Sequence, residues 1–365
     1  MKQYRVAVIG RTGKGDYGHG LDTVWLNNDR AEIVAVADEK EEGRAMAKTR
    51  LKAPNAYADY REMLAMEKPE IVSVAVRWLD AHRDMVMACA EAGASIFLEK
   101  PLCRTLQEAD EMIAACDKHH VKCAIAHQTR YSPRLKVVKQ LIADGKLGEL
   151  IELRGRGKED ARGGGQDLMV LGTHILDLMR LLAGDARWCF ARIWRDGKKA
   201  LPGDVRQGGE GMGLIQGDRI TATYGFDNGV TGTFGTIKAK EGASRRFALQ
   251  VFGSKGVIHL TTGSLPPVYW LDDPSWMPGG SKANWQLITS AGPGQPEPLK
   301  DSGMDLGNRL IVADLMDAIE KDRQPLGSIH DGRASLEMIL AVYESHKLER
   351  PVELPMKNRR HPLGG

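Results

Sequence analysis

The sequence has no long hydrophobic run and almost no excess of either charge, and both absences exclude classes of protein. Lys and Arg number 51 against 48 Asp and Glu, which leaves a formal net charge of +3. This near balance gives no argument for a nucleic-acid or membrane partner. No apolar run approaches the ~20 residues that span a bilayer, and no signal peptide precedes the first expected strand. We therefore expect a cytoplasmic protein with no nucleic-acid and no membrane partner.

The sequence is also poor in cysteine. It contains five, an odd number, and no two of them have the CxxC spacing of a metal or redox motif. Most lie in apolar surroundings, as in MACAEAG and IAACDK, which is typical of reduced structural thiols. Nothing near Cys103 marks a reactive thiol, so a nucleophilic role is disfavoured. We predict neither a disulfide framework nor a metal site.

The first 125 residues alternate between expected strands and expected helices. Continuous β-branched runs such as YRVAVIG predict buried parallel strands. The alternation predicts an α/β fold, in which residues 1–125 form a dinucleotide-binding domain of Rossmann type, with helices on both faces of a parallel sheet. The expected strands are 4–10, 31–38, 70–76, 95–100 and 121–128, and the expected helices are 21–30, 41–51, 81–93 and 106–120.

From about residue 148 apolar and polar residues alternate along the chain instead. The segment DRITATYGFDNGVTGTFGTIKA has an Asn-Gly hairpin signal between two alternating runs. We therefore expect residues 126–365 to form an α+β domain for substrate binding and oligomerisation, with a large open and mostly antiparallel sheet. Helices are expected at 172–184, 308–322 and 332–349, of which the last two could pack back on the first domain. The Gly-, Pro- and Ser-rich stretch 274–300 is expected to be a long surface loop.

A glycine-rich stretch, GRTGKGDYGHG, follows the first expected strand. A strand, a glycine-rich turn and a helix place backbone N–H groups where they can hold a pyrophosphate. The register is unusual, because Thr12 stands two residues after Gly10, and a literal GxGxxG begins only at Gly13. We predict cofactor contacts from Gly10, Thr12, Gly13 and Gly15, although a flexible turn would give the same pattern.

Asp38 ends the second expected strand, 28 positions after Gly10. A carboxylate there can accept hydrogen bonds from both hydroxyls of an adenosine ribose. It would repel a 2′-phosphate, so NAD is favoured as the cofactor, while Lys40 and Arg44 leave NADP open. No GxxxxGK[ST] occurs, which argues against an ATP-binding loop.

Four segments in order carry a resemblance to a known family. The helical stretch AHRDMVMACAEAGA leads into the strand SIFLEKPL, which contains Glu99-Lys100-Pro101, and HQTRYSPRLKVVKQLIADGKLGEL leads into the second domain. VLGTHILDLMRLLAGD carries a GxHxxD helix, and LQVFGSKGVIHL carries a GxxG strand pair. Together they resemble the glucose-fructose oxidoreductase, inositol dehydrogenase and rhizopine-catabolism superfamily, Gfo/Idh/MocA, over nearly the whole chain.

The resemblance implies an NAD(P)-dependent oxidoreductase that transfers a hydride between nicotinamide and a secondary alcohol or ketone of a sugar, polyol or related cyclic compound. It implies that Lys100 faces the substrate, where its ammonium can stabilise a developing alkoxide. By the same analogy His174 is the general acid/base. Asp177, three residues on, shares its helix face and is placed to orient it. Taken alone, a lysine at a strand end and a core histidine would need no catalytic role.

Further contacts come from the same resemblance. The residues implied to bind the cofactor are His82, Glu99, Lys100 and Gln128, and those implied to contact the substrate are Tyr131 and His174. Trp78 departs from the family, which usually has a small residue, Pro or Asn there, and it is a further candidate for substrate contact. Trp78 could stack on adenine or on a sugar face, or simply pack.

The sequence departs from the family pattern before the histidine. Many sugar and polyol dehydrogenases of this family carry an aspartate four residues before it, where this chain has Val170. Asp167 lies a helical turn further back and is not assumed to substitute. Either Lys100 and His174 share the proton transfer, or the substrate differs from a simple polyol.

Two rival functions and the assembly remain open. An NAD-requiring enzyme that cleaves or eliminates across a glycosidic bond through transient oxidation fits the missing aspartate, and a non-catalytic NAD-binding regulator fits the same fold. Trp270, Trp276 and Trp285 could form a carbohydrate platform or cover a subunit interface. The open sheet should pair with another subunit to give a dimer or tetramer.

Overall fold

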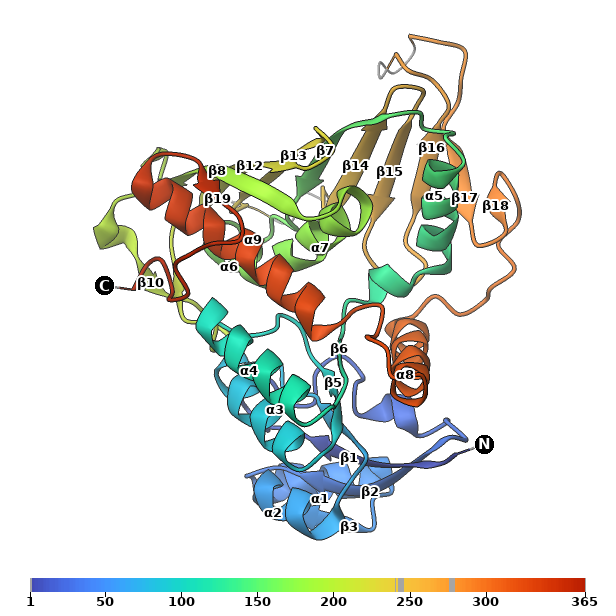
Figure 1. The fold of residues 1–365 in the computed structure, drawn as a ribbon, viewed down its shortest axis with the longest axis vertical. Helices are drawn as coiled ribbons and strands as arrows, with labels where there is room; N and C mark the ends of the chain where they lie inside the picture. The colour runs from blue at the N-terminus through green and yellow to red at the C-terminus, as the bar shows by residue number, and fades with distance from the viewer. Residues whose placement is uncertain (1, 240, 242–245, 276–279, 365) are drawn as a thin grey trace. The chain divides into compact units, whose positions relative to one another are not determined.

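The computed structural model describes residues 2–239, 241, 246–275 and 280–364, and the described chain divides into two compact units (Figure 1). The first comprises the chain up to Ala126, Gly209–Gly213 and Met304–Arg333. The second comprises His127–Gly208, the described part of Leu214–Gly303, and the chain from Ala334 on. The units are therefore not continuous in sequence, because residues 304–333 group with the first.

The first unit contains a six-stranded parallel sheet in the order β3-β2-β1-β4-β5-β6. The strand order reverses at β1, which lies between β2 and β4. Ligands bind open α/β sheets at such a switch point, beyond the carboxyl ends of the strands. The strands are β1 (Tyr4–Ile9), β2 (Ala31–Ala37), β3 (Asn55–Tyr57), β4 (Ile71–Val74), β5 (Ser95–Leu98) and β6 (Cys123–Ile125).

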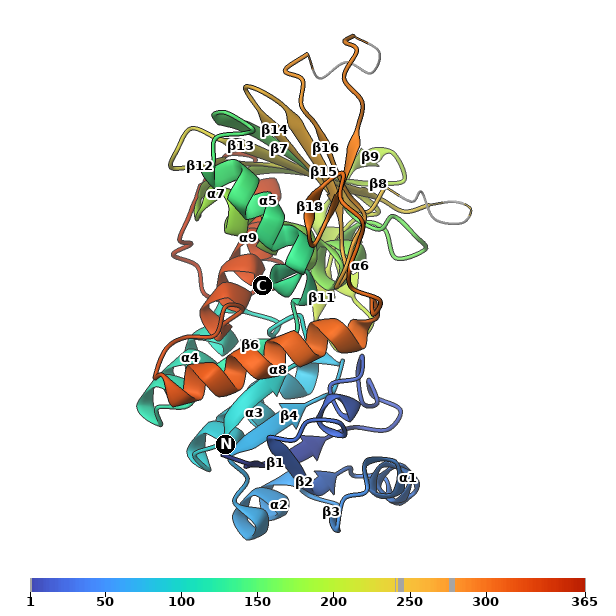
Figure 2. The ribbon, with the colours of Figure 1, turned by 90° about the vertical axis from the view of Figure 1, so that its right-hand side faces the viewer.

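Helices cover this sheet, and its central strands are accordingly apolar and buried. α3 contacts α2 and α4, while α8 contacts β5, β6 and the short 3-10 helix η1. Figure 2 shows α8 alongside these strands, from which it is far in sequence. The helices are α1 (Glu41–Leu51), α2 (Tyr60–Glu67), α3 (His82–Glu91), α4 (Leu106–Lys118) and α8 (Met304–Glu320), with η1 (Thr23–Trp25) and η2 (Leu79–Ala81).

The second unit is built on a large mixed sheet in the order β18-β17-β16-β15-β14-β7-β13-β12-β8-β19, with β9 paired to β8. Only the β7–β13 pairing is parallel, and the other described pairings are antiparallel. The strands are β7 (Leu150–Arg156), β8 (Ala186–Arg195), β9 (Lys198–Lys199), β12 (Arg219–Phe226), β13 (Thr231–Ile237), β14 (Ala248–Gly253), β15 (Val257–Thr261), β16 (Val268–Leu271), β17 (Gln286–Thr289), β18 (Gly292–Pro293) and β19 (Val352–Glu353). A separate pair is formed by β10 (Arg206–Gln207) and β11 (Leu214–Ile215).

One face of this sheet carries helices, and α7 packs directly on β7. A Cβ added to Gly155 would lie 2.3 Å from Ile175 of α7, so a glycine is needed for the close approach. Leu153 points to the same face, whereas Arg154 points to the opposite, outward face. The helices of this unit are α5 (Pro133–Ala143), α6 (Gly165–Val170), α7 (Gly172–Ala183) and most of α9 (Ile329–Leu348), with η3 (Gln128–Tyr131) and η4 (Pro202–Asp204).

Two local expectations are wrong. Residues 21–30 form only the 3-10 turn η1 rather than a helix, because Trp25 is fixed in the core by a hydrogen bond from its Nε1 to Ser73 Oγ (3.0 Å) and Ala31 already begins β2. The stretch 274–300 contains β17 and β18, whose short alternating run was hidden among glycines and prolines. The five cysteines are free and buried, as expected for structural thiols.

Candidate active site

The glycine loop after β1 folds on itself. Arg11 N donates to Asp16 O and Asp16 N donates to Arg11 O, which closes residues 11–16 into a tight turn. Gly13 N donates to the Asp16 carboxylate (2.8 Å) and Lys14 N to Arg11 O (2.9 Å). Within the described chain, the loop amides of Gly15 and Tyr17 have no hydrogen-bond partner. These two amides are among the donors that an anion at this loop could use.

Asp38 lies beside this loop, buried at the end of β2. Its Oδ2 accepts hydrogen bonds from Thr12 N (3.0 Å) and Thr12 Oγ1 (2.6 Å), and its Oδ1 accepts one from Lys40 N (3.0 Å). A Cβ on Gly43 of α1 would lie 1.8 Å from Thr12 Oγ1. Thr12 therefore reaches Asp38 only because position 43 has no side chain.

Each glycine predicted to contact the cofactor is required by a different close contact or backbone conformation. The ring of Tyr17 occupies the space where a Cβ on Gly10 would be, at 2.2 Å. Gly13 has a φ of +79°, and Lys40 Nζ lies 3.1 Å from its Cβ position. A Cβ on Gly15 would lie 2.6 Å from the backbone nitrogen of Trp78. The Trp78 ring also approaches Gly15, so this residue packs on the glycine loop.

Glu99 links the glycine loop to the turn that contains Lys100 and Pro101. It is wholly buried after β5, and its Oε1 accepts hydrogen bonds from His19 N (3.0 Å) and contacts His19 Nδ1 (2.5 Å). Burial disfavours its charge, but the bonds from His19 and the nearby Lys100 outweigh burial and lower the pKa of Glu99 below its usual value. The carboxylate is therefore held ionised between the glycine loop and the turn.

Lys100 follows Glu99 and is 8% exposed. Its backbone nitrogen donates to Glu99 Oε2 (3.0 Å), and its peptide bond to Pro101 is cis. The residue thus stands at the carboxyl end of β5, at the ligand-binding edge of the sheet.

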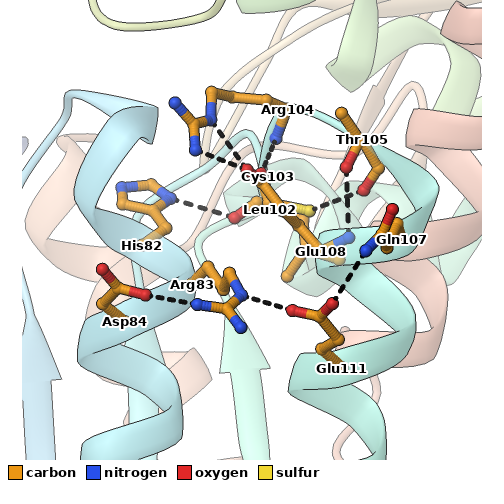
Figure 3. A network of polar contacts seen from close by, with 10 residues as sticks. All are labelled: His82, Arg83, Asp84, Leu102, Cys103, Arg104, Thr105, Gln107, Glu108 and Glu111. Carbon is orange, nitrogen blue, oxygen red and sulfur yellow. Dashed lines mark hydrogen bonds and ion pairs between the residues drawn. The ribbon is translucent and has the colours of Figure 1, made fainter. Parts of the chain in front are cut away.

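His82 holds the turn that follows Lys100 (Figure 3). Its Nδ1 lies 3.1 Å from Pro101 O and 3.0 Å from Leu102 O, and its Nε2 lies 2.6 Å from Val76 O. The ring is fully buried. One side chain therefore ties the end of β4 to the Lys100 turn, and its nitrogens are occupied by backbone carbonyls.

The far end of the same turn is tied to α4. Arg104 donates to the Glu108 carboxylate from its backbone (2.9 Å) and from its guanidinium (2.9 and 2.5 Å), and Thr105 Oγ1 caps α4 by accepting from Glu108 N (3.1 Å). Figure 3 shows these contacts around the turn, with the Arg83–Glu111 pair beside them. Burial raises the pKa of Cys103, which agrees with its expected lack of reactivity.

His174 lies in α7 of the second unit and is half-buried. Its ring is edge-on to the ring of His127, at 5.6 Å between centroids, and to Phe247 at 6.4 Å. Gln128 and Tyr131, on η3 of the same unit, are also half-buried.

Asp177 is buried and holds several partners. Arg130 Nε donates to both carboxylate oxygens (3.1 and 3.0 Å), Ser335 Oγ lies 3.4 Å from Oδ1, and His127 Nδ1 lies 3.4 Å from Oδ1. Burial disfavours its charge, but the charges of His127 and Arg130 outweigh it, and the pKa of Asp177 is lowered. The sequence pattern predicted that Asp177 lies beside His174. It gave no sign of His127, because His127 and Asp177 are 50 positions apart in the chain.

Asp167 is bonded to two backbone amides and to one hydroxyl. It is buried and accepts hydrogen bonds from Thr236 Oγ1 (2.5 Å), Glu159 N (3.1 Å) and Lys158 N (3.2 Å). Burial raises its pKa. These bonds fix the 157–160 loop to β13 and occupy the Asp167 carboxylate.

Two further observations concern metal binding and membrane spanning. Among the described residues, no three His, Cys, Asp or Glu side chains are grouped to hold a metal ion. No helix in the described ranges has the length and apolar character needed to cross a membrane.

Comparisons with known proteins cover nearly the whole chain. The family model "Oxidoreductase family, NAD-binding Rossmann fold" matches residues 4–127, and "Oxidoreductase family, C-terminal alpha/beta domain" matches residues 139–354. D-apiose dehydrogenase from Paraburkholderia graminis is 26% identical, over 97% of this chain and 90% of that protein. Myo-inositol 2-dehydrogenase from Thermotoga maritima is 27% identical, over 68% of this chain and 74% of that protein.

A solved structure shares the fold. Levoglucosan dehydrogenase in complex with NADH and levoglucosan superposes with a TM-score of 0.77 at 21% identity, over 97% of this chain and all of that one.

Proposed function

Because the chain belongs to the oxidoreductase family with an NAD-binding Rossmann fold and a C-terminal alpha/beta domain, we propose that it acts on a secondary alcohol, or the matching ketone, of a sugar, polyol or related cyclic compound. The family and its dehydrogenase relatives make it an NAD(P)-dependent dehydrogenase. The substrate class is supported by relatives named for D-apiose, myo-inositol and levoglucosan. The observation that carries the proposal is Lys100, held at the ligand edge of the sheet and joined to the glycine loop through Glu99 and His19.

The residues of the glycine loop fit NAD. The unpartnered amides of Gly15 and Tyr17 would donate to the pyrophosphate. Asp38 would accept from a ribose hydroxyl in exchange for the Thr12 hydroxyl that it now binds. Bound NAD supplies the hydride acceptor or donor, and the protein supplies orientation and proton transfer.

Lys100 and His174 are proposed to divide the remaining work. The ammonium of Lys100 would donate a hydrogen bond to the reacting oxygen and stabilise the negative charge that develops there. The imidazole of His174 would take the proton of the substrate hydroxyl during oxidation and return it during reduction. With Val170 at the position of the family aspartate and Asp167 bonded to backbone amides, these two groups share the proton transfer.

Turnover on a panel of aldoses, polyols, inositols and anhydrosugars tests the proposal, with NADH absorbance as the measurement. We expect NADH formation with at least one of them, and a loss of 10²-fold or more in kcat for Lys100→Ala or His174→Ala, in the range for general acid–base residues. NAD binding without turnover by any compound, unchanged by either substitution, would indicate a regulator. Cleavage or elimination that needs NAD but forms no net NADH would indicate the transient-oxidation alternative.

We also propose that the chain self-associates through the outward face of its large sheet. The pairing registers place Trp188, Ile237, Tyr269 and Leu287 on this face, and Trp285 lines a hollow there beside Tyr269. Each of these five large apolar side chains is between 36 and 42% exposed. Apolar surface spread over one face is typical of an interface. Trp270 is buried on the other face, and Trp276 lies outside the described residues, so a carbohydrate platform of all three tryptophans loses support.

Light scattering after gel filtration measures this association. We expect a dimer or tetramer for the unmodified chain and a monomer for the double variant Tyr269→Glu/Leu287→Glu. Met66→Glu, at an exposed position of α2 in the first unit, is the matched control and should keep the mass of the unmodified chain. A monomeric unmodified chain would reject the proposal.

A further inference from the structure

We propose that His127 is a positioning residue for His174, and that the buried His127–Asp177 pair fixes the orientation of the His174 imidazole and the pH at which it takes up a proton. The inference rests on the proposed function, in which His174 handles the substrate proton. All the residues involved belong to the second unit.

The two nitrogens of His127 face different polar groups, a hydroxyl within hydrogen-bond distance and a carboxylate at ion-pair distance. Nδ1 lies 3.4 Å from Asp177 Oδ1, and Nε2 lies 3.2 Å from Thr173 Oγ1. The residue is 2% exposed. The ring is enclosed by the protein and meets the His174 ring in an edge-on arrangement.

Asp177 supplies the counter-charge for this histidine. Its carboxylate is ionised, since the charges of Arg130 and His127 outweigh burial. A carboxylate beside one nitrogen and a hydroxyl beside the other can satisfy an imidazolium, which needs two acceptors.

A positive charge on His127 would act on His174 directly. The two ring centroids are 5.6 Å apart, at an interplanar angle of 61°. A like charge within about 6 Å disfavours a second positive charge. His174 would then release its proton more readily, which favours the neutral form that accepts a proton from a hydroxyl.

Other charged groups around the pair have partners of opposite sign. From η3, Arg130 is bonded to Asp177, and Ser335 of α9 contacts the same carboxylate. Beside Phe247, Arg246 pairs with the buried Glu159 (2.6 Å). His127 contacts the His174 ring directly, in the edge-on arrangement described above.

Histidine titration by NMR tests this, with ¹³C-labelled imidazoles and the His174 signal assigned from its loss in His174→Gln. The variant His127→Phe keeps an aromatic ring, removes both nitrogens and leaves the Arg130–Asp177 bond. We expect the pH midpoint of His174 to rise by about one unit, and the acid limb of kcat/KM to move with it on any substrate found. His119→Phe, at the C-cap of α4 in the first unit, controls for loss of a histidine and should leave His174 unmoved.

A second variant keeps the test decisive if His127→Phe does not fold. Thr173→Val removes the Nε2 partner with little change of shape, and should raise the His174 midpoint by a smaller amount. An unchanged or lowered midpoint in a folded variant would overturn the inference. A raised midpoint in a chain that turns over no compound of the panel would retain the His127 assignment and reject the dehydrogenase proposal instead.

Discussion

Thr12 donates two hydrogen bonds to one oxygen of Asp38, from its amide at 3.0 Å and from its hydroxyl at 2.6 Å. The residue that replaces the usual second glycine of a dinucleotide loop thus occupies the carboxylate expected to bind a ribose. The two residues act as one element of the cofactor site, and Gly43 is the position that permits it.

Gly43→Ala should separate Thr12 from Asp38. Alanine within a helix normally stabilises it by about 1 kcal/mol relative to glycine, but here the new Cβ would lie 1.8 Å from Thr12 Oγ1 and 2.9 Å from Asp38 Oδ2. We expect a lower Tm and weaker NAD binding, measured by thermal unfolding and tryptophan fluorescence. The double variant Thr12→Gly/Gly43→Ala removes the clash and should recover Tm, as coupled neighbours do. Additive effects of the two substitutions would contradict this.

The positions of the main site residues at strand ends can be predicted from the sequence. Their side-chain partners cannot, for a physical reason. The strand ends that carry Asp38 and Lys100 are predicted by periodicity, because buried parallel strands are continuous apolar runs. The partners of Asp177 are not predicted, because Arg130 and His127 at η3 and Ser335 in α9 are all far from Asp177 in sequence. Likewise no spacing predicts that Thr12 turns onto Asp38.

Lys40 should decide how well NADP is accepted. Its ammonium lies 3.1 Å from the Cβ position of Gly13, and its amide binds Asp38, so a positive charge stands at the ribose end of the loop. A hydrogen bond to a charged group contributes about 1.5–3 kcal/mol, so Lys40→Ala should weaken NADP binding roughly tenfold or more and change NAD binding less. Isothermal titration with both nucleotides measures the ratio. Lys48→Ala, exposed on the last turn of α1, is the control. An equal loss for both nucleotides would place Lys40 on the pyrophosphate instead.

His82→Ala should impair catalysis through the Lys100 turn. The substitution removes the ring whose nitrogens lie against the buried carbonyls of Val76, Pro101 and Leu102. A buried carbonyl that loses its donor costs about 1–3 kcal/mol. We expect a lower Tm, and a kcat that falls by more than KM changes. Arg83→Ala is the control, at the residue of α3 that follows His82. It removes only partly exposed ion pairs to Asp84 and Glu111, which contribute about 0–1 kcal/mol to stability, so kcat should be unchanged. A normal kcat in His82→Ala would show that the turn holds without the imidazole.

Glu99 should make the stability of the protein fall in acid. Its pKa is lower in the folded chain than in the unfolded one, so its ionised form stabilises the fold above the unfolded pKa, and this contribution is lost as pH drops through the folded pKa. Glu99→Gln keeps the shape of the side chain and removes the charge that His19 and Lys100 face. We therefore expect the variant to be less stable than the unmodified chain at pH 7 and the difference to shrink as pH falls below about 4. Urea unfolding across this range measures it, and Glu91→Gln, exposed at the end of α3, should show no such convergence. A difference that stays constant with pH would mean that Glu99 contributes through its shape and not through its charge.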